Sequence, residues 1–315
     1  MSQGRTDQAE TSAVWVILGP TASGKGRLAV ELGRRFPVEI VSVDSMKAYR
    51  GMDIGTATPS AEDRETVPHH MIDVLDPSEK FNVGKYCSMA EEAMEKIRAR
   101  GRRPLLVGGS ALYIKGLIWG LFEGPDAQPE LRKKLRKTAE EQGSDVLHDR
   151  LKEIDPEAAG NIHPNDLKRI VRAIEVYEVT GEPLSEQQNE FDDSPRLESV
   201  MVGLKWPREM LHERINRRVD RMMEQGLLEE VKNVRPKLGP QAAQAVGYKE
   251  LIQYLDGELT LEEAVERVKA KTRQLAKHQM TWFRKFEGLH WINPTAFEAP
   301  QELAKEAARI FSTGS

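Results

Sequence analysis

The sequence predicts an α/β protein with a P-loop NTPase-like core, in which helices flank a parallel sheet, and with an inserted all-helical domain. Three observations lead to this prediction. Short apolar, β-rich segments alternate with helical segments in the first third of the chain. A glycine-rich loop that ends in lysine directly follows the first of these segments. A long, highly charged helical stretch then separates the third β-rich segment from the fourth.

The individual elements follow from apolar spacing and from helix caps. The predicted strands are residues 13–18, 38–43, 104–108 and 200–206. The spacing of Leu28, Leu32 and Phe36 predicts a helix after the first strand, and the third strand leads into another from Ala111. In the charged stretch we expect helices over 129–142, over 143–154, and from the cap at 163–166 to Gly181. Helical spacing returns over 210–234 and 261–286.

This layout predicts two domains. Residues 13–123 and 196–315 would form the core with its C-terminal helices, and residues 124–195 the helical insertion. Residues 1–12 are polar, lack a secretory signal and are expected to form a flexible tail. No apolar run is long enough to span a bilayer, so we expect no membrane partner.

Composition limits the possible partners and compartments. The 315 residues carry a net charge of -4, so any site for a polyanion must be a local basic face on an acidic surface. Cys87 is the single cysteine, which excludes an internal disulfide framework and a cysteine-based zinc site. A reducing compartment, and hence a cytoplasmic location, is expected.

The loop Gly19-Pro-Thr-Ala-Ser-Gly-Lys25 has the glycine and lysine spacing of a Walker A loop. Its backbone N–H groups would face phosphate oxygens, while Lys25 and the dipole of the next helix supply positive charge. Gly26 stands where a Ser or Thr hydroxyl usually holds Mg²⁺, so diphosphate binding is favoured over ordinary NTP hydrolysis. The residues predicted to bind diphosphate are Gly19, Pro20, Thr21, Ala22, Ser23, Gly24, Lys25 and Gly26.

Two further polar residues follow predicted strands at the same edge of the sheet. Asp44 follows residues 38–43, where a carboxylate could bind Mg²⁺ through water or accept a proton, although a turn or cap role is equally compatible with its spacing. Ser110 precedes the helix from Ala111, where its hydroxyl could bind phosphate, cap the helix, or both. The pair His69-His70 fits a structural loop better than a metal site, because adjacent side chains diverge.

Basic residues recur at helical spacing in two places. Lys168, Arg169 and Arg172 lie on one predicted helix, and Lys269, Arg273 and Lys277 on another that carries Trp282 nearby. Either set could follow a phosphate backbone. A solvated charged face is the alternative, and the glutamates near Lys269 favour it.

Several longer motifs resemble the tRNA dimethylallyltransferase family from about Val14 to Trp291. The most specific are Asp44-Ser-Met-Lys-Ala-Tyr-Arg-Gly-Met-Asp-Ile-Gly-Thr-Ala57 and Arg273-Gln-Leu-Ala-Lys-His-Gln-Met-Thr-Trp282. The others, in chain order, are the Walker loop, Pro68-His-His-Met-Ile-Asp73, Gly108-Gly-Ser-Ala-Leu-Tyr113, His163-Pro-Asn-Asp166 and Gly247-Tyr-Lys-Glu250. The resemblance covers nearly the whole chain.

The resemblance implies transfer of a dimethylallyl group from its diphosphate to the exocyclic amino nitrogen of adenosine 37, beside the tRNA anticodon. Asp44 would then be the general base, with Lys25 and Ser110 also catalytic, and Asp44 would hold Mg²⁺ through water. The implied partners are the tRNA anticodon stem-loop and dimethylallyl diphosphate, bound by a monomer. The implied tRNA-binding residues are Asp44, Ser45, Met46, Lys47, Ser110, Arg132, Lys168, Arg169, Ile170, Val171, Arg172, Gln244, Arg273 and Lys277.

The chain departs from the family pattern at three positions. Gly26 replaces Thr or Ser, Ser110 replaces Thr, and Lys47 stands where Gln is common. Two alternative functions therefore remain open from the sequence. A P-loop small-molecule or nucleoside kinase shares the ATP-binding type of loop and the strand-end carboxylate, but would normally need the hydroxyl that Gly26 lacks. A tRNA-binding protein with reduced catalysis is the other alternative.

Overall fold

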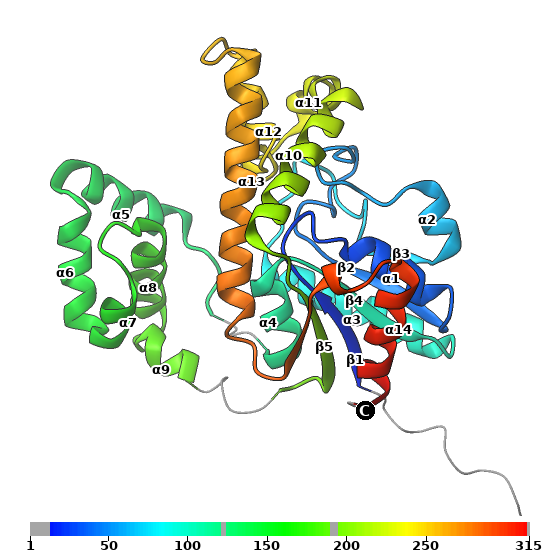
Figure 1. Ribbon diagram of the computed structural model, residues 1–315. Coiled ribbons are helices and arrows are strands. Elements are labelled where there is room, and N and C mark those ends of the chain that lie inside the picture. The colour runs from blue at the N-terminus through cyan, green and yellow to red at the C-terminus, as the bar shows by residue number, and fades with distance from the viewer. Residues whose placement is uncertain (1–12, 121–123, 190–194, 314–315) are drawn as a thin grey trace, which may run out of the picture. The chain divides into compact units, whose positions relative to one another are not determined.

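The computed structural model describes residues 13–120, 124–189 and 195–313 (Figure 1). Contacts divide the chain into two compact units, and the second unit is Trp119–Arg196. The expected bounds of the insertion were 124 and 195. The predicted tail, residues 1–12, lies outside the described residues.

A six-stranded parallel sheet forms the centre of the first unit. Its strands, in spatial order, are β3 (His69–His70), β2 (Val38–Val43), β4 (Arg103–Gly108), β1 (Val14–Leu18), β5 (Ser199–Leu204) and β6 (Leu289–Ile292). The residues of β1 and β2 are buried throughout, as expected for a parallel sheet covered on both faces. The predicted fold class is confirmed.

Helices cover this sheet and extend beyond it. Figure 1 shows them as α1 (Lys25–Gly33), α2 (Ala61–Thr66), α3 (Val83–Ala99), α4 (Ala111–Trp119), α10 (Arg208–Glu224), α11 (Leu227–Val234), α12 (Tyr248–Leu255), α13 (Leu261–Phe283) and α14 (Pro300–Thr313). Three short 3-10 helices span Arg235–Lys237, Ala242–Gln244 and Pro294–Ala296. Apolar side chains of α1 and α14 pack with those of β1 and β5 in one core cluster.

The second unit consists of helices: α5 (Pro129–Gln142), α6 (Ser144–Ile154), α7 (Pro156–Asn161), α8 (Leu167–Thr180) and α9 (Leu184–Asn189). Asp166 caps α8 by accepting a hydrogen bond from the Arg169 amide, and Gly181 ends the helix in the left-handed conformation. The unit has its own hydrophobic cluster, which includes Leu135, Leu151 and Ile174.

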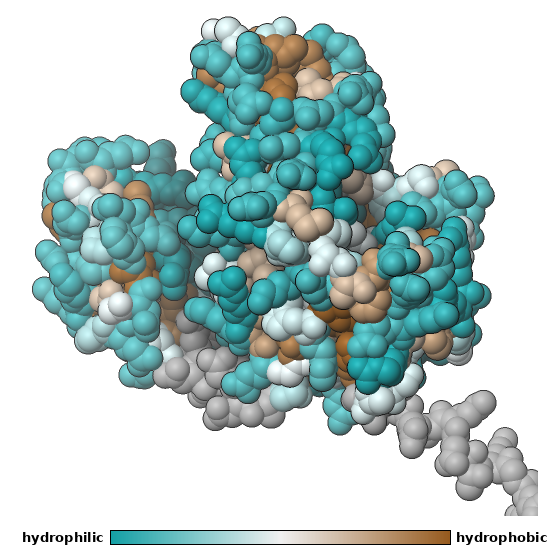
Figure 2. All heavy atoms as spheres, in the orientation of Figure 1, coloured by the Kyte–Doolittle hydropathy of each residue, from teal (hydrophilic) through white to brown (hydrophobic). Residues whose placement is uncertain are grey.

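The chain leaves and re-enters the first unit at neighbouring points. The Leu197 amide donates a hydrogen bond to the carbonyl of Ile118, with 3.0 Å between N and O. In the part of the chain that the structure describes, no helix is long and apolar enough to cross a membrane. On the face shown in Figure 2 the surface is mainly hydrophilic, with small hydrophobic areas.

Candidate functional site

A cavity of about 710 Å³ opens at the carboxyl edge of the sheet. Strand β1 leads into the phosphate loop, β2 into Asp44, and β4 into Ser110, so three separate sequence segments meet there. Helices α10, α12 and α13 complete the wall with Arg218, Tyr248 and Gln279 respectively. The structure therefore brings together the loop, the carboxylate and the hydroxyl that the sequence singled out.

The phosphate loop is shaped by left-handed backbone at two positions. Gly24, at the N-cap of α1, has φ 93°, a conformation that glycine adopts without steric cost. Ala22 has φ 61°, which is strained for a residue with a Cβ. Thr21 to Gly26 line the cavity, whereas Gly19 and Pro20 accept hydrogen bonds of 2.8 Å each from Lys25 Nζ. The ammonium group thus lies within the loop.

Residues from the C-terminal part of the chain hold the loop from outside. Arg214 Nε donates to the carbonyl of Ala22 at 2.9 Å, and Trp206 Nε1 donates to that of Ser23 at 2.9 Å. The Arg214 guanidinium also lies over the Trp206 ring, 4.1 Å from its centroid. These contacts fix the carbonyls outward. The Thr21 and Ser23 amides are themselves bonded within the protein, so the amides at the start of α1, from Gly24 to Gly26, are the ones available to a ligand.

Gln279 of α13 connects the phosphate loop to the loop after β4. Its Oε1 accepts from the Thr21 amide at 2.8 Å, and its Nε2 donates to the carbonyl of Gly109 at 3.0 Å. A Cβ at position 109 would lie 2.3 Å from Gln279 Nε2, so only glycine permits this approach. The side-chain amide of Gln279 therefore sets the spacing between the phosphate loop and the loop after β4.

Three basic side chains and a single carboxylate line the cavity. Burial, helped by the positive charges of Lys47 and Arg218, lowers the pKa of Lys25 to about 7, although Asp44 opposes the shift. Burial also lowers the pKa of Lys47 and the pKa of Arg218, again against the attraction of Asp44. Charges that are costly to hold in this way are stabilised when an anion binds between them.

Asp44 uses one carboxylate oxygen to hold its own turn. Oδ1 accepts hydrogen bonds from the amides of Met46 at 2.9 Å and Lys47 at 3.4 Å. Oδ2 has no hydrogen-bond partner among the described residues. The capping role and the chemical role that the sequence left open are thus divided between the two oxygens of one side chain, and Oδ2 is available to a substrate or to water.

The hydroxyl groups near the loop have different environments. Ser110 Oγ accepts a long hydrogen bond of 3.4 Å from the Ser45 amide and lines the cavity. Ser23 Oγ is buried without a hydrogen-bond partner, which is unusual for a buried hydroxyl. Gly26 is exposed at the second position of α1, and a Cβ there would meet no atom within 4 Å.

Glu230 of α11 anchors the segment that follows Asp44. Its two oxygens accept from the amides of Asp53, Ile54 and Gly55 at 2.9, 2.7 and 3.0 Å. The same carboxylate accepts from the Tyr248 hydroxyl at 2.5 Å, and this bond adds to burial in raising the pKa of that phenol. Gly55 and the residues after it line the cavity, so Glu230 shapes its wall from behind.

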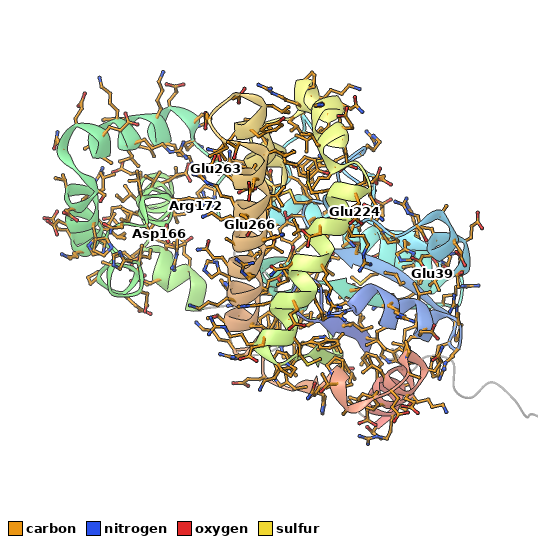
Figure 3. All side chains as sticks on the ribbon, turned by 45° about the horizontal axis from the view of Figure 1, so that its top comes forward. Glu39, Asp166, Arg172, Glu224, Glu263 and Glu266 are labelled. Carbon is orange, nitrogen blue, oxygen red and sulfur yellow. The ribbon has the colours of Figure 1, made fainter. Side chains whose placement is uncertain are left out.

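In the second unit, two of the predicted tRNA-binding arginines share a buried partner. Arg132 contacts Glu175 through two hydrogen bonds of 2.7 Å, and Arg172 donates to it at 2.6 Å. Although burial opposes it, these bonds and one from the Gln128 amide lower the pKa of Glu175 to about 2. Figure 3 shows Arg172 on α8, the helix that Asp166 caps. The side chains of Arg132 and Arg172 are each about one third exposed.

The predicted tRNA-binding residues of α8 differ in their exposure. The side chains of Ile170 and Val171 are buried in the core of the second unit, on the inward face of α8, and their tRNA contact stays a prediction. Lys168 and Arg169 are exposed on the same helix.

The basic residues of α13 differ in their surroundings. Lys269 forms ion pairs with Asp220 and Glu266, as the solvated-face alternative predicts; Figure 3 shows Glu266 on the same helix. Arg273 donates to Asn216 at 2.6 Å, whereas Lys277 is exposed. Ser45, Met46, Lys47 and Gln244 line the cavity, but Arg273 and Lys277 do not.

Sequence motifs did not reveal most of the residues that support the site from a distance. Arg218, Glu230 and Arg214 come from helices far along the chain. Gln279 lies within the motif 273–282, but its contact with the phosphate loop spans 258 residues and is not evident from that motif. His69 and His70 form the edge strand β3 rather than the expected loop. Within the described residues His70 bonds Glu39, and His69 bonds the carbonyl of Val67.

Fold and site together define a P-loop enzyme that handles a phosphorylated substrate beside a carboxylate. The family profile described as IPP transferase matches residues 47–286. This chain belongs to that family, as its motifs predicted.

Known relatives resemble the chain along most of its length. A tRNA dimethylallyltransferase from Caldanaerobacter subterraneus subsp. tengcongensis is 45% identical over 296 residues, 91% of this chain and 94% of that one. The crystal structure of a tRNA isopentenylpyrophosphate transferase from Bacillus halodurans aligns with a TM-score of 0.70 at 40% identity, covering 96% and 98% of the two chains. A eukaryotic dimethylallyltransferase acting on tRNA aligns with a TM-score of 0.80 at 29% identity, covering 96% and 80%.

Proposed function

We propose that this protein transfers a dimethylallyl group from dimethylallyl diphosphate to the exocyclic amino nitrogen of adenosine 37 in tRNA, releasing pyrophosphate. Its curated relatives are named as tRNA dimethylallyltransferases, and a structural relative is described as acting on tRNA. The kinase alternative is disfavoured by this kinship and by the absence of a hydroxyl at Gly26.

The observation that carries this proposal is the charge arrangement of the cavity. Lys25, Lys47 and Arg218 line the cavity together with Asp44 and the residues of the phosphate loop, so three basic side chains share it with one carboxylate. An allylic diphosphate leaves readily once its developing charge is stabilised. A cavity with excess positive charge and one available carboxylate oxygen meets the needs of both halves of the transfer.

The proposed reaction follows from these positions. The adenine nitrogen forms a bond to C1 of the allyl group while the bond from C1 to the diphosphate oxygen breaks. Asp44 Oδ2 accepts the proton that the amine loses, because Oδ1 is held by its turn. The departing pyrophosphate is retained by the amides of the phosphate loop and by Lys25, which exchanges its loop carbonyls for phosphate oxygens.

We further propose that Mg²⁺ accompanies the diphosphate and is held through water by Asp44. The residues fit an indirectly bound ion: Oδ2 of Asp44 is available, position 26 lacks the usual hydroxyl, and the described residues contain no cluster of three or more metal-ligating side chains. When bound, the ion would neutralise charge on the diphosphate. Ser23 and Ser110 would supply hydroxyl contacts to the same oxygens.

The finer features of the substrate complex also belong to the proposal. Adenosine 37 must leave the anticodon stack to reach the cavity, so the anticodon stem-loop would be the recognised part of the tRNA. We expect the protein to act as a monomer, and its single cysteine predicts a cytoplasmic location. Lys168, Arg169, Arg132 and Arg172 of the second unit would contact RNA phosphates.

Mass analysis of tRNA nucleosides tests the proposal. Unmodified tRNA incubated with the protein, Mg²⁺ and dimethylallyl diphosphate should contain adenosine whose mass has grown by one dimethylallyl group. A parallel reaction with ATP as the donor tests the kinase alternative. Transfer of phosphate, or tRNA binding without any change in nucleoside mass, would contradict the proposed function.

A further inference from the structure

Three large apolar side chains are exposed at the rim of the cavity. Leu112 is 48% exposed, Leu275 39% and Trp282 45%, and all three line the cavity. Among the described residues, Trp282 is the one aromatic side chain in the exposed class. Exposed apolar side chains gathered at a cavity mouth indicate a contact with a ligand rather than a random surface position.

Leu112 belongs to α4, and Leu275 and Trp282 belong to α13. Packing within the protein does not explain why these side chains are exposed. Leu275, Gln279 and Trp282 share one face of α13, and Gln279 lies deeper, on the phosphate loop. The side chain of Trp282 makes no hydrogen bond or ring stacking with any described residue. Leu112 is exposed although its neighbours Ala111 and Tyr113 are buried.

The charge of α13 indicates what kind of ligand approaches this rim. Between Glu266 and Glu287 the chain carries seven lysines and arginines and no acidic residue. Lys277, Arg284 and Lys285 form no ion pair within the described part of the chain. Positive charge without acidic partners, beside exposed apolar rings and chains, suits a nucleic acid better than an apolar peptide or a lipid tail.

We infer that Trp282, supported by Leu275 and Leu112, is a stacking platform for the nucleobase next to the target adenosine. This inference rests on the proposed function. Whenever the target base occupies the cavity, its covalently linked neighbour must lie at the mouth, where the platform is. Extrusion of the target breaks the stacking of that neighbour in the anticodon loop, and the tryptophan face replaces the lost contact. The platform accepts any base, because every base has a π-face.

A double-mutant cycle between protein and RNA tests this inference. The RNAs are an anticodon stem-loop and two copies with an abasic nucleotide immediately 5′ or 3′ of the target. Trp282→Ala should weaken binding of the intact RNA by about tenfold, and Trp282→Phe by less. One of the two abasic RNAs should bind the wild type about tenfold more weakly than the intact RNA does. Its affinity should not fall further when Trp282→Ala is introduced. Leu275→Ala should show a smaller effect of the same pattern.

The controls separate stacking from other causes. Met210→Ala removes a side chain that is 43% exposed but does not line the cavity, and it should leave RNA binding unchanged. Affinity for pyrophosphate should be equal in all variants. Equal losses for Trp282→Ala on intact and both abasic RNAs would overturn the inference, as would unchanged binding. Transfer by the wild type is measured in the same series, so failure of the proposed function is recognised separately from failure of stacking.

Discussion

At the scale of single residues, Asp44 combines a structural and a chemical task in one carboxylate. Asp44→Asn keeps an oxygen that accepts from the Met46 amide but removes the proton acceptor. We therefore expect the single-turnover transfer rate to fall by about a hundredfold to ten-thousandfold. tRNA affinity from filter binding should barely change. A variant that transfers at a near-normal rate would exclude Asp44 as the base.

Gly26 allows the effect of a missing hydroxyl to be measured directly. The position is sterically open, so Gly26→Thr should place a hydroxyl near the diphosphate without a clash. The replacement should make the free energy of dimethylallyl diphosphate binding more favourable, or lower the activation free energy of transfer, by about 1.5–3 kcal/mol at most. This is the value of a hydrogen bond to a charged group.

Gly26→Ala is the matched control for that experiment. Both replacements remove a glycine from the first turn of α1 and should raise the free energy of unfolding by a few tenths of a kcal/mol or more. Only the threonine variant should change diphosphate binding or rate. Equal diphosphate affinity in the two variants would mean that Lys25, Ser110 and the loop amides are sufficient.

Lys25 makes stability depend on pH above neutrality. Its pKa is about 7 in the folded protein, whereas the ordinary pKa of a lysine is 10.5, so between these limits the unfolded state binds more protons. The free energy of unfolding should therefore rise with pH across this window, and the contribution of Lys25 should become independent of pH below about 7, where the amine is charged in both states. Urea titrations of the wild type and of Lys25→Met would measure the effect.

The same shift predicts proton uptake on ligand binding. A bound pyrophosphate favours the ammonium form of Lys25, so calorimetry at pH 8 in buffers of different ionisation enthalpy should detect protons entering the complex. Lys25→Met should take up fewer protons than the wild type. Identical pH dependence of unfolding in both proteins would contradict the role given to Lys25, since the lowered pKa of Lys47 would then account for all of it.

At the scale of elements, Glu230 connects α11 and α12 to the segment after Asp44. Glu230→Gln replaces one acceptor oxygen by an amide that faces backbone donors, leaving at least one of them unsatisfied at about 1–3 kcal/mol. We expect a lower melting temperature, by about 2–4 °C per kcal/mol, and a lower kcat/KM for the allyl donor. Glu229→Gln is the control, because Glu229 is exposed and pairs only with Lys232 among the described residues; equal behaviour of the two variants would remove the anchoring role.

The sequence predicted most elements because their signals are local. The helix over 129–142 and the strand over 38–43 have the expected bounds, and the Gly181 cap ends α8. The helical segment 210–234 is instead two helices, α10 and α11. Gly226, which follows the C-cap of α10 and is the N-cap of α11, adopts the left-handed conformation with φ 97° and so interrupts the helix. Strand β6 and helix α14 were not predicted, since a four-residue edge strand has little pattern of its own.

The candidate site was predictable where a motif lies at a strand end, and not where tertiary contacts decide. Asp44 and Ser110 follow their strands, and topology brings them to the phosphate loop. Arg218 gives no such signal, because an arginine on an amphipathic helix is ordinary until its partner is known. Gln279 lies within the motif 273–282, but the motif does not indicate that it contacts the phosphate loop. The pairing of Arg132 and Arg172 with Glu175 likewise joins α5 to α8, two helices whose contact no sequence pattern indicated.

At the scale of the whole molecule, the second unit is attached at neighbouring points of the first. The hydrogen bond from Leu197 to Ile118 shows that a short linker can join them. Replacing residues 120–196 by a short Gly-Ser linker should leave pyrophosphate affinity within a few fold, because every residue lining the cavity belongs to the first unit. tRNA binding and transfer should be lost. Cooperative thermal unfolding is the control for folding, and normal tRNA affinity of the shortened protein would contradict a role of the second unit in RNA recognition.

The same hydrogen bond has a consequence for how the chain reaches its native state on the ribosome. Central strand β1 pairs with β4 and β5, yet β5 is synthesised only after the whole of Trp119–Arg196. A flexible segment of that length would impose a loop-closure entropy cost that grows with the logarithm of its length. Folding of the helical unit shortens the flexible segment between β4 and β5, so part of that cost is met before β5 pairs. Folding of the second unit would therefore help β5 to pair with β1. A substitution in the core of the second unit would then slow folding of the first unit without changing any residue of the first unit.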